Sequence, residues 1–481
     1  MDDTLRIQAN EILNSAPCSI EMPAGTGKTH LLAAVAAIAG EKGRRSLILT
    51  HTNAGVDASR TRLKEFGVRS DSARVDTITG WAFILSLSYA RIAGLIIPGV
   101  PDWTRSREYV VAASRVADAN AIVRVHELSF SYLLVDEYQD CSTSQHALVT
   151  ALSKAIPRTV LFGDRLQAIF RFDDQDPLVD WDQDVLPAFP EYKVAVVPHR
   201  WRGHNEALGT WMLEIRGQLV AQGSFNALDH QVEGLKFVSN SQQGDIASVA
   251  FGFSGVDESV VLLDKWPSDV AGHASRLKGI YSVMEELQGK FMRQALEQLP
   301  PDGDYRLAHW LGVFAKNCAI GLADLDAPIM SRLLKNQGIT RYSRRGITDI
   351  LEALEAVRSD PTYERLLRSA EVLKRNPGVR IYRWEGWRDT LAAIRATIDN
   401  REPPADNLAR IRDRLRYTGR VHGGSRAPRV ASRILLVKGL EYDHVVIANL
   451  ANFDDPRDLY VALSRARKTV TIMGRSHRIT F

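Results

Sequence analysis

Short apolar runs that end in small or acidic residues recur along the first part of the chain. They cover residues 18–22, 45–50, 131–135 and 159–163, and segments with helical spacing of apolar positions separate them. A strand buried on both faces of a parallel sheet is a continuous apolar run, and successive parallel strands need a crossover connection. The alternation therefore predicts an α/β fold with a parallel sheet. Ligands of such sheets bind at the carboxyl ends of the strands, so the residues after these runs are candidates for chemistry.

The second half of the chain has strand patterns first and then a long helical stretch. Residues 234–239 and 258–265 are apolar strand patterns, whereas about 275–418 shows successive amphipathic helices separated by prolines. We expect the following organisation: a first lobe at 1–190 with a helical insert at about 82–127, a second lobe at 191–274 and 425–481, and an inserted helical subdomain at 275–424.

Composition indicates a soluble globular protein without disulfides. Of its 481 residues, 45% are hydrophobic and 25% are charged, and the net charge of +4 permits a polyanionic partner without requiring one. Cys18, Cys141 and Cys318 lie far apart without a CxxC pair, so neither a disulfide framework nor a zinc site is expected. The first residues lack the features of a signal peptide, and polar positions interrupt the apolar segment 81–100, which we interpret as a buried helix. We expect a cytoplasmic protein with no membrane segment.

The segment 21–31, EMPAGTGKTHL, has the features of a phosphate-binding loop. Gly25 and Gly27 carry no Cβ, so the backbone N–H groups of residues 24–28 can face one concavity at the positive end of the following helix. Lys28 would reach the β- and γ-phosphates of a nucleotide, and Thr29 would bind Mg²⁺. Met22 stands where the strict pattern has its first glycine, and a glycine-rich turn with a chance lysine is the alternative. The nucleotide-binding residues expected here are Ala24, Gly25, Thr26, Gly27, Lys28, Thr29 and His30.

Paired carboxylates follow the apolar run at 131–135. In SYLLVDEYQD, Asp136 is placed to hold Mg²⁺, and Glu137 is placed to orient and activate an attacking water molecule. The next strand pattern ends in GDRLQ, where Gln167 is expected to contact the γ-phosphate region. These residue types after neighbouring parallel strands predict a nucleotide-hydrolysing site with a magnesium ion.

Small polar and aromatic residues follow other strand patterns. Thr52 and Asn53 offer polar groups to a phosphate backbone, although both residue types are also ordinary helix caps. Trp81 is either a core residue or a stacking platform. Phe170 and Phe172 alternate, so that one can face the core while Phe172 stacks on a base, a contact worth roughly 1–3 kcal/mol in single-strand binders.

A run of arginines follows the helical stretch. It is either a solvated face or a surface that tracks phosphates or docks a partner. Its members are Arg410, Arg412, Arg414, Arg416, Arg420, Arg426, Arg429 and Arg433.

The ordered strings GTGKT, DEYQD and GDRLQAIF resemble the superfamily-1 helicases of the UvrD/Rep/PcrA type. VVPHRWRGHNEAL at 196–208 looks like the fourth motif of that family, with Arg200 as the matching arginine and Arg202 in reserve. LLVKGLEYDHVVI at 435–447 looks like the fifth motif, and LYVALSRARK at 459–468 looks like the sixth, with Arg465 as the arginine finger. The chain departs from the family at His51, His199 and Asp173, and at Leu435 and Leu436, which replace polar residues.

The resemblance implies two RecA-like P-loop lobes with parallel sheets and a helical insertion in each. It implies ATP and Mg²⁺ as cofactors and single-stranded DNA as partner. The catalytic residues it implies are Lys28, Asp136, Glu137, Gln167, Arg200 and Arg465, and it adds Gln8, Gly439 and Glu441 to the nucleotide-binding residues. The expected metal ligands are Thr29 and Asp136, and the expected DNA-binding residues are Thr52, Asn53, Thr77, Trp81, Phe172 and Lys438.

The function implied is an ATP-dependent DNA helicase or translocase on single-stranded DNA, with 3′-to-5′ polarity. The alternative is a DNA-sensing ATPase, gated by nucleotide, that regulates a partner nuclease without processive unwinding. Compact members of this superfamily resemble the chain and occur in antiviral systems of the Gabija type beside a separate nuclease, so a nuclease subunit is an expected partner. A P-loop kinase of small molecules is disfavoured by DEYQD, GDRLQ and the two late arginines together.

Overall fold

The computed structural model describes residues 1–99, 101–170, 175–240, 245–253, 257–285, 289–339, 346–418 and 429–481. The chain forms two compact units. The first comprises Met1–Phe225, Asp454–Lys468 and Thr480–Phe481, and the second comprises Asn226–Phe453 and Thr469–Ile479. Each unit is built on a parallel sheet, which confirms the predicted α/β class with two RecA-like lobes.

The first unit has a five-stranded parallel sheet with the order β1-β5-β4-β2-β3. Its strands are β1 (Cys18–Glu21), β2 (Ser46–Thr50), β3 (Ala73–Thr77), β4 (Tyr132–Val135) and β5 (Thr159–Gly163). The register pairs Ile20 with Phe162 on one side of β5 and Leu134 with Val160 on the other. Each of the four apolar runs noted in the sequence forms a strand of this sheet. Every strand therefore delivers its following loop to the same edge.

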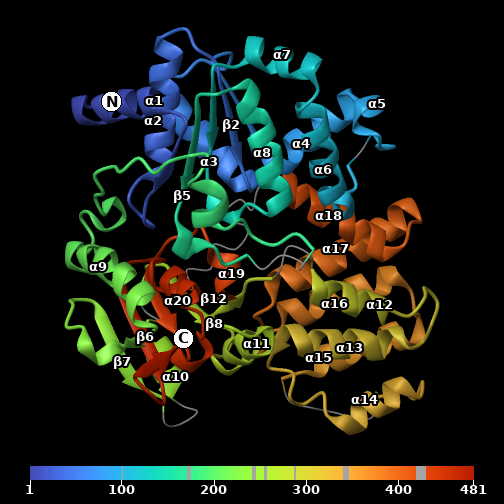
Figure 1. Cartoon of the computed structure of the whole chain (residues 1–481). Helices are drawn as coiled ribbons and strands as arrows, with labels where there is room; N and C mark the ends of the chain where they lie inside the picture. The colour runs from blue at the N-terminus through green and yellow to red at the C-terminus, as the bar shows by residue number, and fades with distance from the viewer. Residues whose placement is uncertain are drawn as a thin grey trace. The chain divides into compact units, whose positions relative to one another are not determined.

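Helices cover both faces of this sheet (Figure 1). On one face lie α1 (Asp3–Ser15), α2 (Lys28–Glu41) and α3 (Asn53–Glu65), which share a core with Ile20, Ile48 and Phe162. On the other face lie α4 (Ile78–Ser88), α6 (Ser106–Ala117), α7 (Asn120–Ser129) and α8 (Thr143–Ala155). The run LLAAVAAIA within α2 is apolar all round because this helix is buried between the sheet, α1 and α3.

The predicted helical insert of the first lobe begins with α4 and continues through α5 (Ala90–Ala93), the 3₁₀ turn η1 (Trp103–Arg105), α6 and α7. Trp81, expected in the core or on a stacking surface, lies in this core with its ring 6.0 Å from that of Phe130, centroid to centroid. No helix in the described ranges is both long and apolar enough to cross a membrane.

Irregular segments and two further helices complete the first unit. They are η2 (Tyr138–Asp140), η3 (Arg165–Gln167), the π-helical turn η4 (Trp181–Val185), η5 (His199–Trp201), α9 (Glu206–Gln222) and α20 (Pro456–Leu463). α20 contacts η3 and α9. The segment 454–468 and the chain up to Phe225 thus pack with the unit that holds the phosphate-binding loop, and the lobe boundaries expected from the sequence stay predictions.

The second unit contains a six-stranded sheet with the order β7-β14-β13-β8-β12-β9. Its strands are β7 (Leu235–Ser239), β8 (Val260–Asp264), β9 (Ser282–Val283), β12 (Arg429–Arg433), β13 (Tyr442–Ile447) and β14 (Ala466–Gly474). β8 pairs in parallel with both β12 and β13. The helical elements around it are η6 (Ala227–Asp229), α10 (Asp245–Gly252), α11 (Pro267–Arg276), α19 (Ile434–Val437) and η7 (Leu450–Asn452). The short strands β6 (Ser224–Asn226) and β15 (Arg478–Thr480) lie where the chain passes from one unit to the other.

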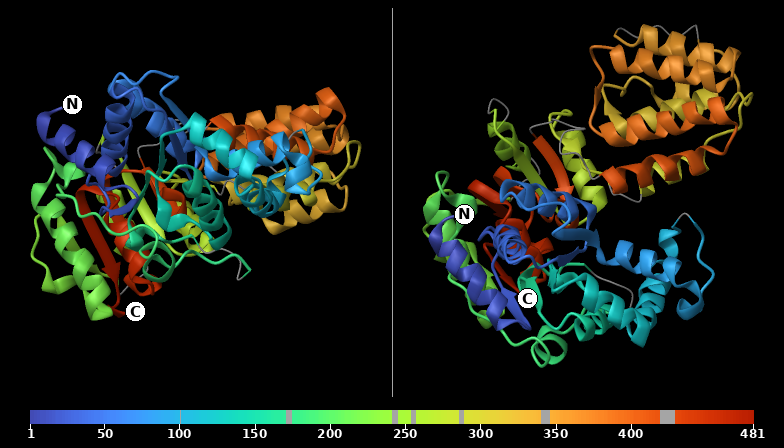
Figure 2. Two further views of the ribbon diagram at one scale, coloured as in Figure 1. Left: turned by 45° about the horizontal axis from the view of Figure 1, so that its top comes forward. Right: turned by 90° about the horizontal axis from the view of Figure 1, so that it is seen from above.

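The helical stretch of the second unit has a hydrophobic core of its own, seen as the yellow and orange helices of Figure 2. Its helices are α12 (Lys290–Glu297), α13 (Leu307–Cys318), α14 (Ala327–Leu334), α15 (Thr348–Ser359), α16 (Tyr363–Arg375), α17 (Trp384–Asn400) and α18 (Pro404–Thr418). The short strands β10 (Ala319–Ile320) and β11 (Arg380–Ile381) form an antiparallel pair beside them. Phe314 stacks on Trp310 at 5.0 Å and on Trp387 at 5.5 Å between ring centroids. Offset aromatic stacking of this kind stabilises a helical core beyond the area that it buries.

Candidate active site

The loop between β1 and α2 contains two glycines with left-handed backbone. Gly25 has φ +74° and Gly27 has φ +90°. A Cβ on Gly25 would lie 2.8 Å from Trp201 Cζ3 and 2.9 Å from the Cβ of Arg200, so a side chain there would clash. No side chain in the described ranges caps the amino end of α2. The N–H groups of its first turn are therefore available to an anion, which is how helix amino ends bind phosphate.

Lys28 lies among the carboxylates that follow β4. Its Nζ is 2.8 Å from Glu137 Oε2 and 4.0 Å from Asp136 Oδ1, and the side chain is 8% exposed. Burial lowers the pKa of Lys28, but the negative charges of Glu137 and Asp136 outweigh it and the net shift is upward. Thr29 Oγ1 donates a hydrogen bond to Asp136 Oδ2 at 3.1 Å. Burial raises the pKa of Asp136 to about 6, against the opposing effect of Lys28.

Polar side chains connect Glu137 to the end of β5. Gln139 donates to Glu137 Oε2, and its own Oε1 accepts a hydrogen bond from the Asp164 N–H at 2.9 Å. Asp164 is fully buried and accepts from Gln167 Nε2 at 3.0 Å. Glu137 has φ +54°, a sparsely populated conformation for a residue with a side chain. The ends of β4 and β5 thus form one hydrogen-bonded network.

Arg465 joins this network from the end of α20. It is 1% exposed, and its Nη2 donates to Gln167 Oε1 at 3.2 Å and to Ser464 Oγ at 2.8 Å. Its Nε donates to the carbonyl of Val461 at 3.0 Å. The guanidinium is therefore held by polar atoms next to the glutamine expected near the γ-phosphate.

Arg200 and its neighbours pack directly on the phosphate-binding loop. The Arg200 N–H donates to the carbonyl of Gly25 at 2.9 Å, and Arg200 Nη1 donates to the carbonyl of Ser464. Trp201, fully buried, fills the space beside Gly25. The Ala24 N–H donates to the hydroxyl of Tyr460 at 3.0 Å, so this N–H, expected to face a phosphate, is satisfied by a side chain. Burial raises the pKa of Tyr460, which keeps the hydroxyl neutral.

A second ionic cluster lies at the carboxyl end of β1, just before the phosphate-binding loop. Glu21, the last residue of β1, accepts from Arg165 Nε at 2.9 Å and from Arg216 Nη2. Arg216 comes from α9 and also donates to Asp164 Oδ1 at 3.1 Å. Burial raises the pKa of Glu21, but the hydrogen bonds and charges of Arg165 and Arg216 outweigh it, so the net shift is downward. This cluster connects the strand before the loop to α9 and to the network around Gln167.

The side chains present fit a magnesium nucleotide. A threonine hydroxyl and a buried carboxylate are the oxygen donors that Mg²⁺ prefers, and Thr29 and Asp136 already contact each other. An uncapped helix amino end and a buried ammonium group fit the phosphates. The contact between the threonine and the aspartate makes this pair the candidate metal site. Among the described residues there is no cluster of three or more His, Cys, Asp or Glu that could hold a metal ion.

The remaining expected nucleotide-binding residues are spread over both units. Gln8 lies half-buried on α1, and the exposed ring of His30 packs on Phe66 with centroids 4.8 Å apart. Thr26 Oγ1 donates to the carbonyl of Pro23 at 2.7 Å, inside the loop. Gly439, with φ +81°, and Glu441, which is exposed, belong to the second unit. Their roles stay predictions.

The expected DNA-binding residues are placed as helix caps, core or surface. Thr52 accepts from the Gly55 N–H at 3.0 Å and Thr77 from the Gly80 N–H at 2.9 Å, and Asn53 begins α3. Trp81 is buried in a core, as described above. Lys438 follows α19 in the second unit. Phe172 lies outside the described residues, and so does the position of Asp173.

Several arginines of this run form ion pairs or hydrogen bonds within the second unit. Arg412 is 4% exposed, and its Nη1 lies 2.8 Å from Asp389 Oδ2 and 3.7 Å from Glu385 Oε2. Arg410 pairs with Glu402, and Arg429 donates to the carbonyl of Phe253 at 2.9 Å. Arg412 is therefore a structural residue and not part of an exposed basic surface. The side chains of Arg414, Arg416, Arg420 and Arg426 lie outside the described part of the chain.

The structure adds residues that the sequence interpretation did not assign to the site. Glu21, Trp201, Arg216 and Tyr460 contact the loop or its network over sequence separations that local patterns do not encode. Of these four residues, only Glu21 has a local sequence signal, because it is an acidic residue at the end of a buried strand.

Comparison with known proteins identifies part of the first unit. Residues 102–178 match the family model described as the UvrD/REP helicase N-terminal domain. The matched segment includes β4, β5 and the side chains of Asp136, Glu137 and Gln167.

Two curated relatives are similar to a stretch of the chain. The protein named ATP-dependent DNA helicase Rep from Buchnera aphidicola subsp. Schizaphis graminum (strain Sg) is 26% identical over 172 residues, which is 35% of this chain and 23% of the relative. The protein of the same name from Buchnera aphidicola subsp. Acyrthosiphon pisum (strain APS) is 28% identical over 144 residues, 29% of this chain and 20% of the relative. The chain thus spans less than a quarter of the length of either relative in these matches.

Proposed function

We propose, from the premise that this chain is UvrD/Rep-like, that it couples ATP hydrolysis to movement along single-stranded DNA. The observation that carries the proposal is the meeting of four separate segments in the first unit. Lys28 contacts Glu137 at 2.8 Å, and Gln167 contacts Arg465 at 3.2 Å, while Gln139 and Asp164 connect the two pairs. A loop that only binds phosphate needs neither the strand-end carboxylates nor a buried arginine.

Each side chain has a proposed role in the reaction. Bound magnesium nucleotide supplies the phosphoryl group that is transferred to water. Lys28 and the amino end of α2 would bind its phosphates, and Thr29 with Asp136 would hold the metal. Glu137 orients the attacking water and takes its proton. Arg200 and Arg465 neutralise the charge that develops in the transition state.

The ion pair between Lys28 and Glu137 has a consequence for this mechanism. In the arrangement described, the lysine neutralises the carboxylate that is to act as base. When Lys28 turns to a phosphate, Glu137 loses this partner and retains the hydrogen bond from Gln139. Binding of the nucleotide is thus coupled to release of the base.

The finer expectations, 3′-to-5′ polarity and a nuclease partner, are part of the proposal. Duplexes with a 3′ or a 5′ single-stranded overhang distinguish polarity, since a 3′-to-5′ motor unwinds only the 3′-tailed substrate. The sensor alternative shares all the residues above. It is favoured if ATP hydrolysis responds to single-stranded DNA while neither substrate is unwound, and an antiviral role then follows only if a nuclease co-purifies.

A pair of variants tests the proposed roles. Lys28→Ala should lose nucleotide binding, because the phosphates lose their buried cation. Glu137→Gln should bind ATP and DNA but not hydrolyse ATP, because only the water-activating carboxylate is removed. Nucleotide affinity by calorimetry and phosphate release by a steady-state assay measure the two effects separately. Equal loss of ATP affinity in both variants would exclude the role given to Glu137.

A further inference from the structure

A pocket of about 410 Å³ lies in the first unit, lined by Leu13, Asn14, Ala16, Lys42, Arg44, Tyr132 and Arg158. These residues lie near the amino ends of β1, β2, β4 and β5, which are neighbours in the sheet. The phosphate-binding loop follows the carboxyl end of β1. A four-residue strand is about 13 Å long, so the pocket is at the opposite edge of the sheet from the proposed hydrolysis site. We refer to it as the basic pocket.

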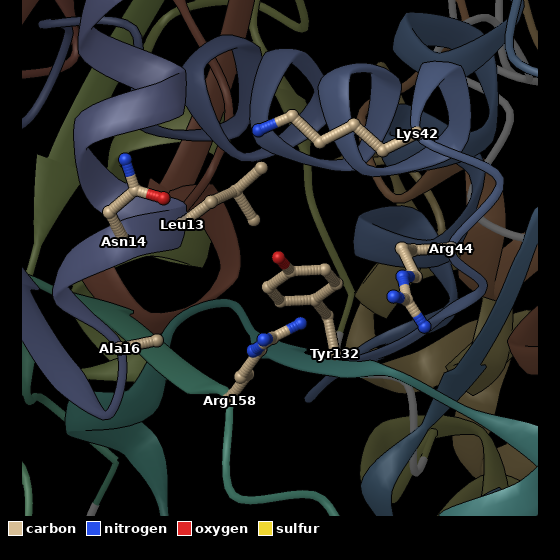
Figure 3. A pocket seen from close by; sticks show the side chains of 7 residues that line it. All are labelled: Leu13, Asn14, Ala16, Lys42, Arg44, Tyr132 and Arg158. Carbon is tan, nitrogen blue, oxygen red and sulfur yellow. The ribbon is translucent and has the colours of Figure 1, made fainter.

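The basic pocket has three cationic side chains and no carboxylate in its lining. Figure 3 shows Lys42, Arg44 and Arg158 around Tyr132 and Leu13. Tyr132 and Leu13 are buried and form its base, and the guanidinium of Arg158 lies over the Tyr132 ring at 5.6 Å from the centroid. Lys42 is held in place by donation to Asn10 Oδ1 at 2.8 Å. The pocket is thus apolar at its base and positive around it.

The lining of the basic pocket supplies no counter-charge to its cations. Some surface arginines of this unit pair with a nearby carboxylate, as Arg62 does with Glu65 at 2.7 Å and Arg124 with Glu127 at 2.9 Å, whereas Arg107 donates instead to Gln175. Within the described ranges, Arg44 and Arg158 have no carboxylate at ion-pair distance. Like charges around one concavity repel each other, and an anion between them removes that cost.

The negative carboxyl ends of nearby helices offset only part of the positive charge that lines the basic pocket. α1 ends at Ser15 and α2 at Glu41, so two carboxyl ends, each equivalent to roughly half a negative charge, are at this edge of the sheet. They favour cations at Lys42 and Arg44. Arg158 follows the carboxyl end of α8, which ends at Ala155, so this third helix end also favours a cation here. Counting also the end of α8 beside Arg158, three positive charges against about one and a half negative charges leave a surplus of about one and a half.

We propose that the basic pocket binds a phosphorylated small molecule with two or more negative charges, such as a nucleotide or a pyrophosphate. Its volume is within the range of about 300–1,000 Å³ that small-molecule sites occupy. The cations converge on one concavity and do not form the stripe that follows a nucleic acid strand. The ligand contacts the end of α2 that lies farthest from Lys28, so its site is separate from that of the hydrolysed nucleotide.

The test uses the full chain with Lys28→Ala as background, so that the phosphate-binding loop contributes little. Inorganic pyrophosphate, ADP and a single-stranded oligonucleotide are titrated by calorimetry at 0.15 M salt. We expect one pyrophosphate per chain, with an affinity that falls about tenfold or more for each of Arg44→Gln and Arg158→Gln, because each removes a charge-assisted hydrogen bond. Arg124→Gln, an exposed arginine of the same unit, is the matched control and leaves the affinity unchanged.

A further variant distinguishes loss of pyrophosphate binding from loss of folding. Asn14→Glu places a carboxylate among the three cations at an exposed helical position and should abolish pyrophosphate binding while the melting temperature is retained. Failure of pyrophosphate to bind the Lys28→Ala background overturns the proposal, and so does binding that survives Arg44→Gln with Arg158→Gln or Asn14→Glu. Binding of the oligonucleotide alone, lost in the same variants, also overturns it, because the pocket then contacts a strand backbone. None of these results depends on ATP hydrolysis, so they are independent of the proposed function.

Discussion

At the scale of single residues, the site depends on a small number of charges held in buried positions. Lys28 and Arg465 are almost inaccessible to solvent, and each is within hydrogen-bond distance of a side chain expected near the γ-phosphate. Buried charges of this kind act strongly on a reacting group because little water screens them. Removal of Arg465 should therefore affect the rate more than it affects nucleotide binding, whereas removal of Lys28 also removes the cation that binds the phosphates.

The two late arginines provide the first test at this scale. Arg200→Ala and Arg465→Ala should each reduce kcat by about 10³-fold or more with smaller changes in ATP affinity, as expected of groups that stabilise transition-state charge. Arg202→Ala is the matched control, since this exposed neighbour follows the same 3₁₀ turn. A large loss in kcat for Arg202→Ala with none for Arg200→Ala would show that the arginine was assigned to the wrong position.

Arg216 is a positioning residue that can be tested by stability. Arg216→Gln leaves Glu21 and Asp164 without this partner, and breaking a largely buried pair should cost about 3 kcal/mol of unfolding free energy. Arg216→Lys should restore part of it. Arg69→Gln, whose pair with Asp71 is exposed, should change the unfolding free energy little.

Arg216→Gln should also change the pH dependence of the unfolding free energy. The pKa of Glu21 lies below its ordinary value of 4.5 in the folded chain. A carboxyl with a depressed folded pKa contributes stability above its unfolded pKa, and this contribution is lost as the pH falls through the folded pKa. Denaturant unfolding between pH 6 and pH 3 should show a shallower loss of stability for Arg216→Gln than for the parent chain. An identical pH dependence in both would contradict the stabilising role of this pair.

At the scale of elements, the phosphate-binding loop is shaped by η5, which packs against it. Gly25 and Gly43 both have left-handed backbone, with φ +74° and +67°, but only Gly25 has neighbours that a Cβ would meet. Gly43→Ala should cost about 1–2 kcal/mol for the backbone conformation alone. Gly25→Ala should cost more and also weaken nucleotide binding, because Trp201 and Arg200 must move. Thermal unfolding and nucleotide titration of both variants measure this, and equal effects would mean that the contact with η5 is unimportant.

Sequence patterns predicted these elements well where the signal is local. The apolar runs, the glycines of the loop and the carboxylates after β4 depend on short-range rules of strand burial and backbone freedom. Tyr460 and Arg216 could not be found in that way, because each meets the loop or its strand across a large separation along the chain. Arg412 was misjudged for a related reason, since its neighbours in sequence suggest an exposed run while Asp389 pairs with it inside the helical core.

At the scale of the whole molecule, the sequence predicted two α/β lobes and an inserted helical body, and the parallel sheets confirm the class. The assignment of segments to lobes is harder to predict, because strand patterns do not reveal which sheet or helix a later segment joins. Residues 454–468 illustrate this, since they bring Tyr460 and Arg465 into the compact unit that holds the phosphate-binding loop. The site of this unit is therefore assembled from both ends of the chain.

The central claim, that hydrolysis by this site is coupled to single-stranded DNA, is tested most directly by one measurement. The steady-state ATPase rate of the purified chain is determined with Mg²⁺, with and without a single-stranded oligonucleotide, alongside Lys28→Ala. Strong stimulation by the strand, absent in the variant, is the result that we predict. Hydrolysis at the same rate with and without the strand would contradict the account, and so would stimulated hydrolysis that survives Lys28→Ala.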